Sequence, residues 1–331
     1  MPDQALVIGG ARSVGRHTVA EFLGAGYEVT LFDRPSHENP FPDRERVDHV
    51  EGDRGTEADI RRVGLDLSPD VVVDCLADKP RHVHAATDIF ADTDAYVYVS
   101  SGDVYAAEQV PKREGETPLR DCPVEAATDD GPETYGQRKA EGDRAVFAAA
   151  DRGVNAMSVR PPDVYGPHDD AGRFGYWIDR VRNHDRVVVP GDGTNLGHLA
   201  FVGDVASAIR TVVESGTPGE AYNVGDGHVP TLGEWVELLA EACGTDVEPV
   251  FASDRELGAV DLSLGSFPLY RSYPNLLETT KLRSLGWAPT PREEALAAMV
   301  EAHGKSDRTG RDEGPDRETE ARLIEVLATV A

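Results

Sequence analysis

The chain has few cysteines and no long hydrophobic run. Its three cysteines, Cys75, Cys122 and Cys243, are isolated and form no C-x-x-C pair, which argues against a disulfide framework and against a metal site of the zinc type. No apolar run approaches the roughly 18 residues that cross a membrane. The first predicted strand begins close to the N-terminus without a charged and then apolar leader. We therefore expect a cytoplasmic protein with no bound metal and no membrane partner.

Positive charge is also scarce. The chain has 33 basic residues, of which five are lysines, against 60 acidic residues, so its net charge is −27. A surface this acidic repels nucleic acid and anionic membranes, and we expect neither as a partner. The composition fits an ordinary acidic protein, or a halophilic one whose self-repulsion is screened within about 3 Å at 1 M salt. We favour the second interpretation, because the composition resembles that of proteins from salt-loving archaea.

Strand and helix patterns alternate along the first half of the chain. Apolar or alternating runs at residues 28–32, 49–53, 70–77 and 96–101 predict strands, and stretches of mixed polarity between them predict helices. This alternation predicts an α/β fold with a doubly wound parallel sheet and helices on both faces. With 331 residues, 40% of them hydrophobic, the chain has room for one large or two modest domains.

A glycine-rich turn follows the first predicted strand, which covers residues 5–8. Gly9 and Gly10 end this strand, and residues at helical spacing follow. Glycines permit backbone conformations that a Cβ forbids, and the free N–H groups of the new helix attract an anion such as a cofactor phosphate. Gly9 and Gly15 match the outer positions of a G-x-x-G-x-x-G pattern, whose middle position is Arg12. An ordinary tight turn explains this pattern equally well when it stands alone.

An acidic residue, Asp33, ends the second predicted strand 18 residues after Gly15. A carboxylate there is placed to accept hydrogen bonds from the adenine ribose of NAD and to repel the 2′-phosphate of NADP. Its alternative role is that of a turn carboxylate. Arg12 and Arg34 are placed to bind the phosphate instead. We predict NAD as the cofactor, with NADP as the alternative.

Tyr135 and Lys139 lie four residues apart in a predicted helix. Side chains at this spacing share one helical face, so the ammonium can favour the ionised form of the phenol. A surface tyrosine packed on a lysine stem gives the same pattern. Ser100 and Ser101 stand at the end of the fifth predicted strand, and ligands bind at such carboxyl ends of parallel strands.

Several motifs occur together and in order. Besides the glycine turn and Asp33, they are S-S-G-D-V-Y at 100–105, Y-G-Q-R-K at 135–139, R-P-P-D-V-Y-G-P at 160–167 and P-G-D-G-T at 190–194. They are followed by F-V-G-D-V-A at 201–206, A-Y-N-V-G at 221–225 and L-G-W-A-P at 285–289. With these motifs the chain resembles the extended short-chain dehydrogenase/reductase family, the NAD-dependent epimerase/dehydratase group. The resemblance extends from Leu6 to about residue 300.

The resemblance implies a Rossmann-type cofactor domain and a smaller C-terminal substrate domain. The implied cofactor domain covers residues 1–165 and 198–225, and the implied substrate domain covers 166–197 and 226–302. Residues 303–331 are expected to form a mobile acidic linker and a loosely attached terminal helix. The family often pairs through four helices, so a homodimer here would use the helices at about 80–93 and 135–150.

By position, the resemblance assigns three catalytic residues. Tyr135 is the general acid/base, Lys139 lowers its pKa and holds the nicotinamide ribose, and Ser101 hydrogen-bonds the reacting oxygen. A phenol with the ordinary pKa of about 10 is too weak a base at neutral pH without a nearby cation. Asp53 and Ala77, at the ends of the third and fourth predicted strands, join the glycine turn in the implied cofactor site.

The implied substrate is a sugar or nucleotide sugar, and four residues are candidates to bind it. Asp103 lies where dehydratases of the family carry an acid, although their Asp-Glu pair is lacking. The arginine that grips the diphosphate in the family falls at about Gly197, beside His198, and Asp163 replaces the usual asparagine. Arg271 is placed to compensate for the missing charge, or else to face solvent.

A divergent branch of the family gives a second hypothesis. The turn G-G-A-R-S-V-G, the strand ending in F-D-R and the motif L-G-W-A-P resemble this branch, which includes chloroplast stem-loop-binding proteins. Some of those proteins handle RNA, so the alternative is a nucleotide-binding regulatory or RNA-associated protein. The presence of Ser101, Tyr135 and Lys139 favours an enzyme, and the charge of −27 argues against RNA.

Overall fold

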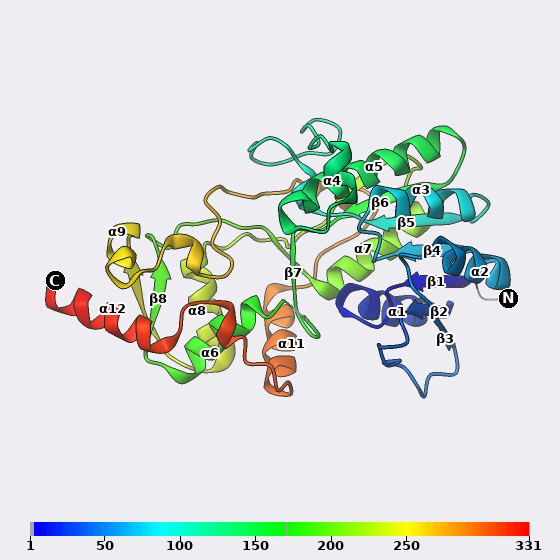
Figure 1. Cartoon of the computed structure of the whole chain (residues 1–331). Coiled ribbons are helices and arrows are strands. Elements are labelled where there is room, and N and C mark those ends of the chain that lie inside the picture. The colour runs from blue at the N-terminus through cyan, green and yellow to red at the C-terminus, as the bar shows by residue number, and fades with distance from the viewer. Residues whose placement is uncertain (1–2, 170, 331) are drawn as a thin grey trace. The chain divides into compact units, whose positions relative to one another are not determined.

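The computed structural model describes residues 3–169 and 171–330, and the chain divides into two compact units. The first unit comprises Met1–Val164, Ala200–Gly225 and Leu277–Pro289, and the second comprises Tyr165–Leu199, Asp226–Leu276 and Thr290–Ala331. Figure 1 shows their elements in chain order from blue to red. The short strands β7 (Asp163–Tyr165) and β9 (Leu199–Phe201) contain points at which the chain passes from one unit to the other.

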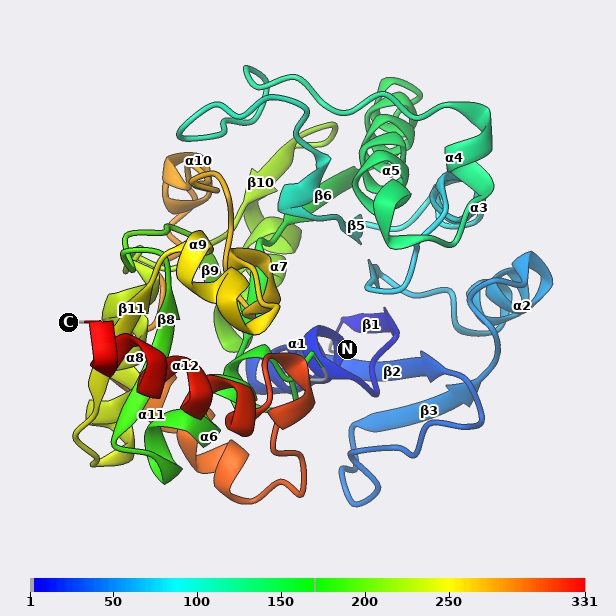
Figure 2. The same ribbon diagram turned by 60° about the vertical axis from the view of Figure 1, so that its left-hand side comes forward.

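A seven-stranded sheet forms the centre of the first unit, and all of its strand pairs are parallel. Its strands, in the order in which they lie side by side, are β10 (Ala221–Asn223), β6 (Ala156–Arg160), β5 (Ala95–Val99), β4 (Val71–Asp74), β1 (Gln4–Ile8), β2 (Glu28–Asp33) and β3 (Val47–Glu51). Figure 2 shows the edge formed by β1, β2 and β3. The order reverses at β1, and ligands bind at the carboxyl ends of strands beside such a point. The predicted doubly wound α/β fold is confirmed.

Helices cover both faces of this sheet (Figure 1). On one face, α1 (Ser13–Ala25) packs against α7 (Val202–Ser215), and on the other α2 (Glu57–Leu67), α3 (Pro80–Ile89) and α5 (Tyr135–Asp151) lie together. Alternate residues of β1 point to opposite faces of the sheet and so belong to two hydrophobic cores. Val7 is buried with α1 and α7, whereas Leu6 and Ile8 are buried with the other three helices. Strands that are buried on both faces explain the nearly continuous apolar runs of the sequence.

Three predicted strands differ from the observed ones by two residues or more at one end, and the strand predicted at 96–101 stops at Val99, as β5. The strand predicted at 49–53 lies two residues earlier, as β3. The strand predicted at 70–77 stops at Asp74, because the carboxylate of Asp74 accepts hydrogen bonds from the backbone N–H groups of Leu76 and Ala77 and so closes a turn. This turn is important for the site described below.

The stretch Leu277–Pro289 belongs to the first unit, although the sequence assigned it to the substrate domain. It contains the short helix α10 (Thr280–Arg283) and Trp287, which is 5% exposed and joins the core beneath α7. The indole N–H of Trp287 donates to the Ser207 hydroxyl at 3.0 Å. Burial of a large aromatic ring with a satisfied N–H explains why this segment packs here.

The second unit is built mainly from helices. It contains a parallel pair of strands, β8 (Arg186–Pro190) and β11 (Glu248–Ala252), and the helices α6 (Arg173–Asn183), α8 (Leu232–Cys243), α9 (Asp254–Leu257), α11 (Arg292–Gly304) and α12 (Arg317–Val330). The polar loop of the first unit carries one further short helix, α4 (Val124–Thr128). Within the described ranges, no helix is both long and apolar enough to span a membrane.

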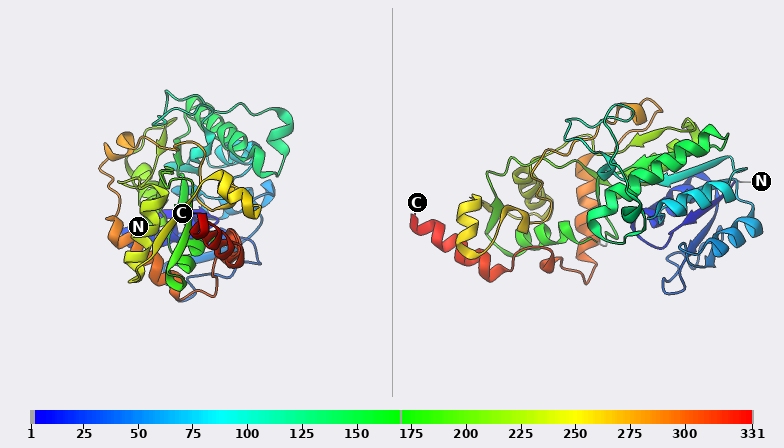
Figure 3. Two further views of the ribbon diagram at one scale, coloured as in Figure 1. Left: turned by 90° about the vertical axis from the view of Figure 1, so that its left-hand side faces the viewer. Right: turned by 45° about the horizontal axis from the view of Figure 1, so that its top comes forward.

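The C-terminal segment differs from the mobile linker and loosely attached helix that we expected. Glu320, on α12 (red in Figure 3), is fully buried and accepts hydrogen bonds from the Arg180 guanidinium at 2.5 Å and from the Tyr176 hydroxyl at 2.7 Å. Arg311, in the preceding segment, bonds Asp179 at 2.8 Å. Both partners of each contact lie in the second unit, so the charges that suggested a solvated tail instead attach it to α6.

Candidate active site

The glycine turn between β1 and α1 has the close contacts that a dinucleotide cradle requires. A Cβ at Gly15 would lie 1.9 Å from the carbonyl oxygen of Gly9, so only glycine allows α1 to begin this close to β1. Gly9 has φ +90, and a Cβ at Gly10 would lie 2.7 Å from Leu31. Arg12 has φ −123 and ψ 150, a conformation open to any residue, which explains how it replaces a glycine here.

Asp33, the last residue of β2, has a buried carboxylate that faces the glycine turn. One carboxylate oxygen accepts the backbone N–H of Ala11 at 3.1 Å. The other oxygen accepts a hydrogen bond from the backbone N–H of Arg34 at 2.9 Å. The same oxygen lies 2.5 Å from Nδ1 of His37, within hydrogen-bond distance. His37 was not predicted from the sequence, because a lone histidine in a polar loop carries no periodic or motif signal. The side chains of Arg12 and Arg34 are exposed.

Asp53 and Ala77 have different surroundings. Asp53 is exposed, and its carboxylate accepts the backbone N–H of Gly55 at 2.8 Å, as in an Asx-turn. Ala77 is buried, and its carbonyl oxygen accepts a hydrogen bond from the Lys139 ammonium at 2.9 Å. Ala77 therefore links the cofactor edge of the sheet to the predicted catalytic lysine.

The three predicted catalytic side chains come together at the carboxyl end of β5. Ser101 follows β5, Tyr135 is the first residue of α5, and Lys139 lies one turn later. The Ser101 hydroxyl is close enough to the Tyr135 phenol to lower the pKa of that phenol, and the Ser101 oxygen accepts the backbone N–H of Asp103 at 3.1 Å. The Lys139 nitrogen lies 5.8 Å from the centre of the Tyr135 ring. Asp103 is half-buried next to this group.

Burial dominates the electrostatics of Tyr135. Loss of water contact, followed by the nearby Asp103 carboxylate, raises the pKa of Tyr135 to about 12, and the Ser101 hydrogen bond opposes this rise. From the sequence we expected Lys139 to lower the pKa of Tyr135, and the shift in the structure has the opposite direction. Tyr135 is half-buried by its exposed surface, and the loss of hydration at the start of a helix cannot be predicted from the spacing of two residues.

Lys139 is buried and held by three groups. Its ammonium donates to the carbonyl oxygens of Ala77 at 2.9 Å and Val99 at 2.8 Å, and lies 4.8 Å from the centre of the Tyr98 ring. Burial lowers the pKa of Lys139 to about 8, and Asp74 is the main group that opposes this. The ammonium is therefore mostly charged at neutral pH and fixed between the ends of β4 and β5.

The four predicted substrate residues are divided between the units. Asp103 and Asp163 belong to the first unit, whereas His198 and Arg271 belong to the second. His198 is buried, and its Nε2 bonds the carbonyl oxygen of Asp226 at 3.0 Å. That contact gives His198 a structural role within the second unit.

Arg271 lies beside Gly197, where the family's arginine was expected. A Cβ at Gly197 would lie 3.8 Å from Cγ of Arg271. The backbone N–H of Arg271 donates to the side chain of Asn195 at 3.0 Å, which fixes this arrangement. Arg271 therefore lies next to the position of the missing arginine, although it is 74 positions later in the chain.

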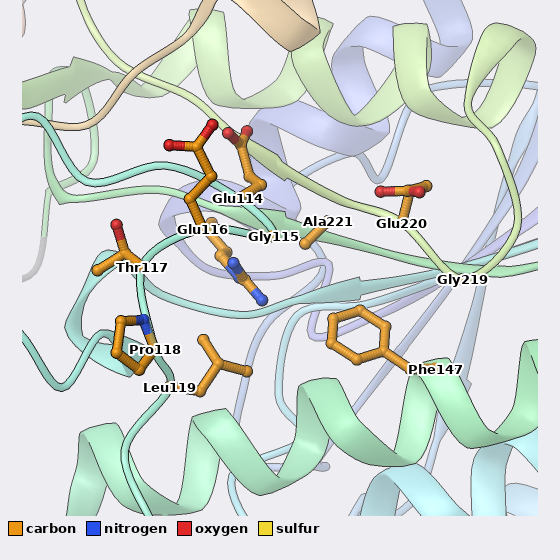
Figure 4. Close-up of a pocket in the computed structure, with 11 residues that line it drawn as sticks. Glu114, Gly115, Glu116, Thr117, Pro118, Leu119, Phe147, Gly219, Glu220 and Ala221 are labelled. Carbon is orange, nitrogen blue, oxygen red and sulfur yellow. The ribbon is translucent and has the colours of Figure 1, made fainter.

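A cavity of about 340 Å³ in the first unit was not predicted from the sequence (Figure 4). Figure 4 shows the carboxylates of Glu114 and Glu116 on one side and the ring of Phe147 on the other. Burial raises the pKa of Glu114, which accepts the backbone N–H of Asn223 at 2.6 Å. The lining comes from segments far apart in the chain, so no local motif marks it. Among the described residues, no group of three or more His, Cys, Asp or Glu is arranged to hold a metal ion.

The sequence profile of the NAD dependent epimerase/dehydratase family matches residues 5–225, which is more than half of the chain. The chain belongs to this family. The match begins in β1 and ends just after β10, so it covers the sheet, the glycine turn and the group at Ser101, Tyr135 and Lys139. The predictions of an enzyme of the epimerase/dehydratase type and of NAD as its cofactor are confirmed at the level of the family.

Individual relatives agree with this assignment. The low-salt glycan biosynthesis protein Agl12 of Haloferax volcanii is 26% identical over 289 residues, 84% of each chain. The chloroplast stem-loop binding protein of 41 kDa b from Arabidopsis thaliana is 25% identical over 252 residues, 72% of this chain and 61% of that protein, in agreement with the predicted branch. A solved dTDP-glucose 4,6-dehydratase of Bacillus anthracis in complex with NAD shares the fold, with a TM-score of 0.70 and 21% identity over 92% of this chain and 97% of that one.

Proposed function

We propose that the enzyme transfers a hydride between NAD and a hydroxyl-bearing carbon of a sugar or nucleotide sugar, with Tyr135 as general acid/base. The observation that carries this proposal is the grouping of Ser101, Tyr135 and the buried Lys139 ammonium, which lies 5.8 Å from the centre of the Tyr135 ring, at the carboxyl end of β5. Proton transfer by a positioned side chain raises rates by about 10² to 10⁴.

The residues of the first unit fit NAD. The absence of a Cβ at Gly15 lets α1 begin next to the Gly9 backbone, and the N-terminus of α1 suits a pyrophosphate. Asp33 offers a buried carboxylate to the adenine ribose. Lys139 uses two of its three N–H donors on carbonyl oxygens, and we assign the third to the nicotinamide ribose. When bound, NAD supplies the hydride acceptor and a positively charged ring.

Tyr135 and Ser101 divide the proton chemistry between them. With a pKa of about 12, the phenol is protonated at neutral pH and is ready to donate its proton to a substrate oxygen. For the reverse direction, a cation near the ring must favour the phenolate, and Lys139 is the nearby cation of this chain. The Ser101 hydroxyl holds the phenol oxygen in place and is available to the reacting oxygen.

The position of Arg271 supports a nucleotide sugar as substrate. Its side chain lies beside Gly197, where the family resemblance placed a diphosphate-binding arginine. A guanidinium binds phosphate oxygens through paired N–H groups, so Arg271 can replace that arginine. Substrate binding by Asp163 and by His198 stays a prediction from the family motifs. Asp103, next to Tyr135, is the candidate acid for a dehydratase reaction.

The second candidate function is nucleotide binding without catalysis, in a regulatory or RNA-associated protein. The match to the chloroplast stem-loop binding protein favours it. The net charge of −27 opposes contact with RNA phosphates.

High-salt adaptation, a cytoplasmic location and a homodimer formed through α3 and α5 stay predictions. The packing of α3 against α5 within the chain is compatible with such a homodimer.

Incubation with NAD and a panel of nucleotide sugars in molar KCl tests the proposal. Liquid chromatography with mass spectrometry separates the two reaction types, because a dehydratase product is lighter by one water and an epimerase product keeps the mass of its substrate but elutes as a separate isomer. Conversion of a nucleotide sugar by either route supports the enzyme. Binding of NAD with no conversion of any sugar in the panel supports the regulatory alternative instead.

A further inference from the structure

A buried ion pair lies behind the catalytic lysine, and no motif in the sequence marks it. Asp74, the last residue of β4, is fully buried, and Arg54, in the loop before α2, is 5% exposed. The Arg54 guanidinium donates to one Asp74 oxygen, Oδ2, from Nε at 2.8 Å and from Nη2 at 2.5 Å. The Tyr96 hydroxyl donates to the same oxygen at 3.1 Å. Arg54 also donates to the carbonyl oxygen of His82 at 2.7 Å, so both ions are well partnered.

The second oxygen of Asp74 faces the turn that holds Lys139. Oδ1 accepts the backbone N–H groups of Leu76 at 3.2 Å and Ala77 at 3.0 Å. The carbonyl oxygen of the same Ala77 accepts the Lys139 ammonium at 2.9 Å. One residue of backbone therefore separates the Asp74 carboxylate from the Lys139 ammonium, and Arg54 fixes the carboxylate from the other side.

The charges of this cluster act on one another. Burial alone would raise the pKa of Asp74, but the Arg54 guanidinium, the backbone N–H of Leu76 and the Lys139 ammonium together outweigh burial, so the pKa of Asp74 lies below its usual value. Lys139 faces Asp74 and Cys75 from β4 and the turn, Asp78 from the same turn, Asp143 from α5, and the Tyr98 ring from β5. Among these groups, Asp74 contributes most toward keeping the ammonium charged.

We propose that Arg54 and Asp74 are positioning residues for Lys139: the pair fixes the turn whose Ala77 carbonyl holds the ammonium, and Asp74 is its counter-ion. This inference rests on the proposed function, in which Lys139 assists Tyr135. A buried ion pair is a costly way to gain stability alone, since apolar residues of similar volume often stabilise a fold as well or better. The two oxygens of Asp74 serve different partners, which an apolar pair could not do.

The chain has only five lysines, so NMR of protein labelled with ¹³C at lysine Cε can follow each ammonium directly. A Lys139→Met variant assigns the signal. Asp74→Asn keeps an oxygen for the N–H groups of the turn and removes the charge. We expect the Lys139 signal to titrate at a pH at least one unit lower in Asp74→Asn than in the wild type, a tenfold change in the proton affinity. If Asp74→Asn does not fold, the double variant Arg54→Met with Asp74→Asn removes both charges, and the expected direction is the same.

Another buried ion pair, that of Arg180 and Glu320 in the second unit, provides a matched control. The double variant Arg180→Met with Glu320→Gln loses a buried pair but is expected to leave the titration of Lys139 unchanged. An unshifted Lys139 signal in the Asp74 variants would overturn the inference, and so would an equal shift in the control.

The NMR measurement does not depend on turnover, so it separates the inference from the proposed function. A shifted Lys139 signal in a protein that converts no sugar supports the positioning role and contradicts the function. Where a substrate is converted, the alkaline limb of the kcat/KM profile is expected to move to lower pH in Asp74→Asn together with the NMR signal. An alkaline limb that stays in place while the signal moves would contradict the link to catalysis.

Discussion

The Asp33 carboxylate and the His37 imidazole lie within hydrogen-bond distance of each other, with 2.5 Å between Oδ1 and Nδ1. The same oxygen accepts the backbone N–H of Arg34, and the other accepts the backbone N–H of Ala11. These contacts hold the carboxylate at the end of β2 in one orientation, next to the glycine turn. A ribose that binds there meets a fixed acceptor, and a 2′-phosphate meets a fixed negative charge.

We therefore predict that the wild type binds NAD more tightly than NADP, and that Asp33→Asn reduces the ratio of the two dissociation constants by about fivefold or more. Two unit charges about 4 Å apart repel by about 1 kcal/mol even in bulk water, and by more at a partly buried site. Calorimetry in molar KCl measures both constants. Tighter binding of NADP by the wild type would contradict the prediction, and an unchanged ratio in Asp33→Asn would show that another group selects the cofactor.

Salt is expected to be required for stability. With a net charge of −27, the carboxylates of the folded state repel one another, and molar salt screens this repulsion. We predict unfolding or loss of activity below about 0.5 M salt, where screening weakens. A melting temperature that does not change between low and molar KCl would refute halophilic adaptation.

The pair of Arg180 and Glu320 is expected to hold the C-terminal helix in place. In Arg180→Met the buried Glu320 carboxylate loses the Arg180 guanidinium and keeps Arg317 at 3.2 Å. Loss of one partner of a buried pair typically costs about 3–5 kcal/mol, and we expect the lower end of this range because Arg317 remains. The double variant with Glu320→Gln is expected to lose less, because no buried carboxylate then lies beside the missing guanidinium. Urea unfolding followed by the fluorescence of Trp177 and Trp235, both in the second unit, measures the difference. Equal losses in the single and double variants would mean that the pair is not coupled.

His82 is expected to make stability depend on pH. Burial, followed by the neighbouring Arg54 charge, lowers the pKa of His82 to about 4. The unfolded chain then binds a proton at higher pH than the folded chain, so stability is lost as the pH falls from about 6.5 toward 4. His82→Gln retains an acceptor for the N–H of Lys79 and removes the titration.

For His82→Gln we expect the fall in unfolding free energy over this pH range to be smaller than in the wild type, by roughly 1–2 kcal/mol after allowance for solvent screening. Urea unfolding at several pH values provides the comparison. Parallel pH profiles for the two proteins would show that another group titrates.

The features that the sequence predicted depend on short spacings. The turn at Gly9 and Gly15, the carboxylate of Asp33 and the pair at Tyr135 and Lys139 each follow from residues that are close in the chain and sit at the ends of strongly patterned elements. The parallel sheet follows from the alternation of such elements. Local pattern was sufficient for the fold, whereas the catalytic roles of Ser101, Tyr135 and Lys139 came from the family resemblance and stay predictions.

What the sequence did not predict depends on contacts between distant residues. Arg54 pairs with Asp74, which is 20 residues later in the chain, and Arg180 pairs with Glu320, which is 140 residues later. A charged stretch looks solvated until its partners are known, so the C-terminal segment was expected to be mobile. The pKa of Tyr135 rises because of burial, which depends on the packing around the start of α5 rather than on the spacing to Lys139.

The central claim is that Tyr135 moves the proton when NAD takes the hydride. The most direct measurement is the single-turnover rate of nicotinamide reduction by a converted nucleotide sugar, followed by absorbance, in the wild type and in Tyr135→Phe, with calorimetry of NAD binding for both. The account predicts that Tyr135→Phe is at least about 100-fold slower, with a dissociation constant for NAD within a few fold of the wild type. A rate near that of the wild type, with NAD bound equally well, would remove Tyr135 from the mechanism.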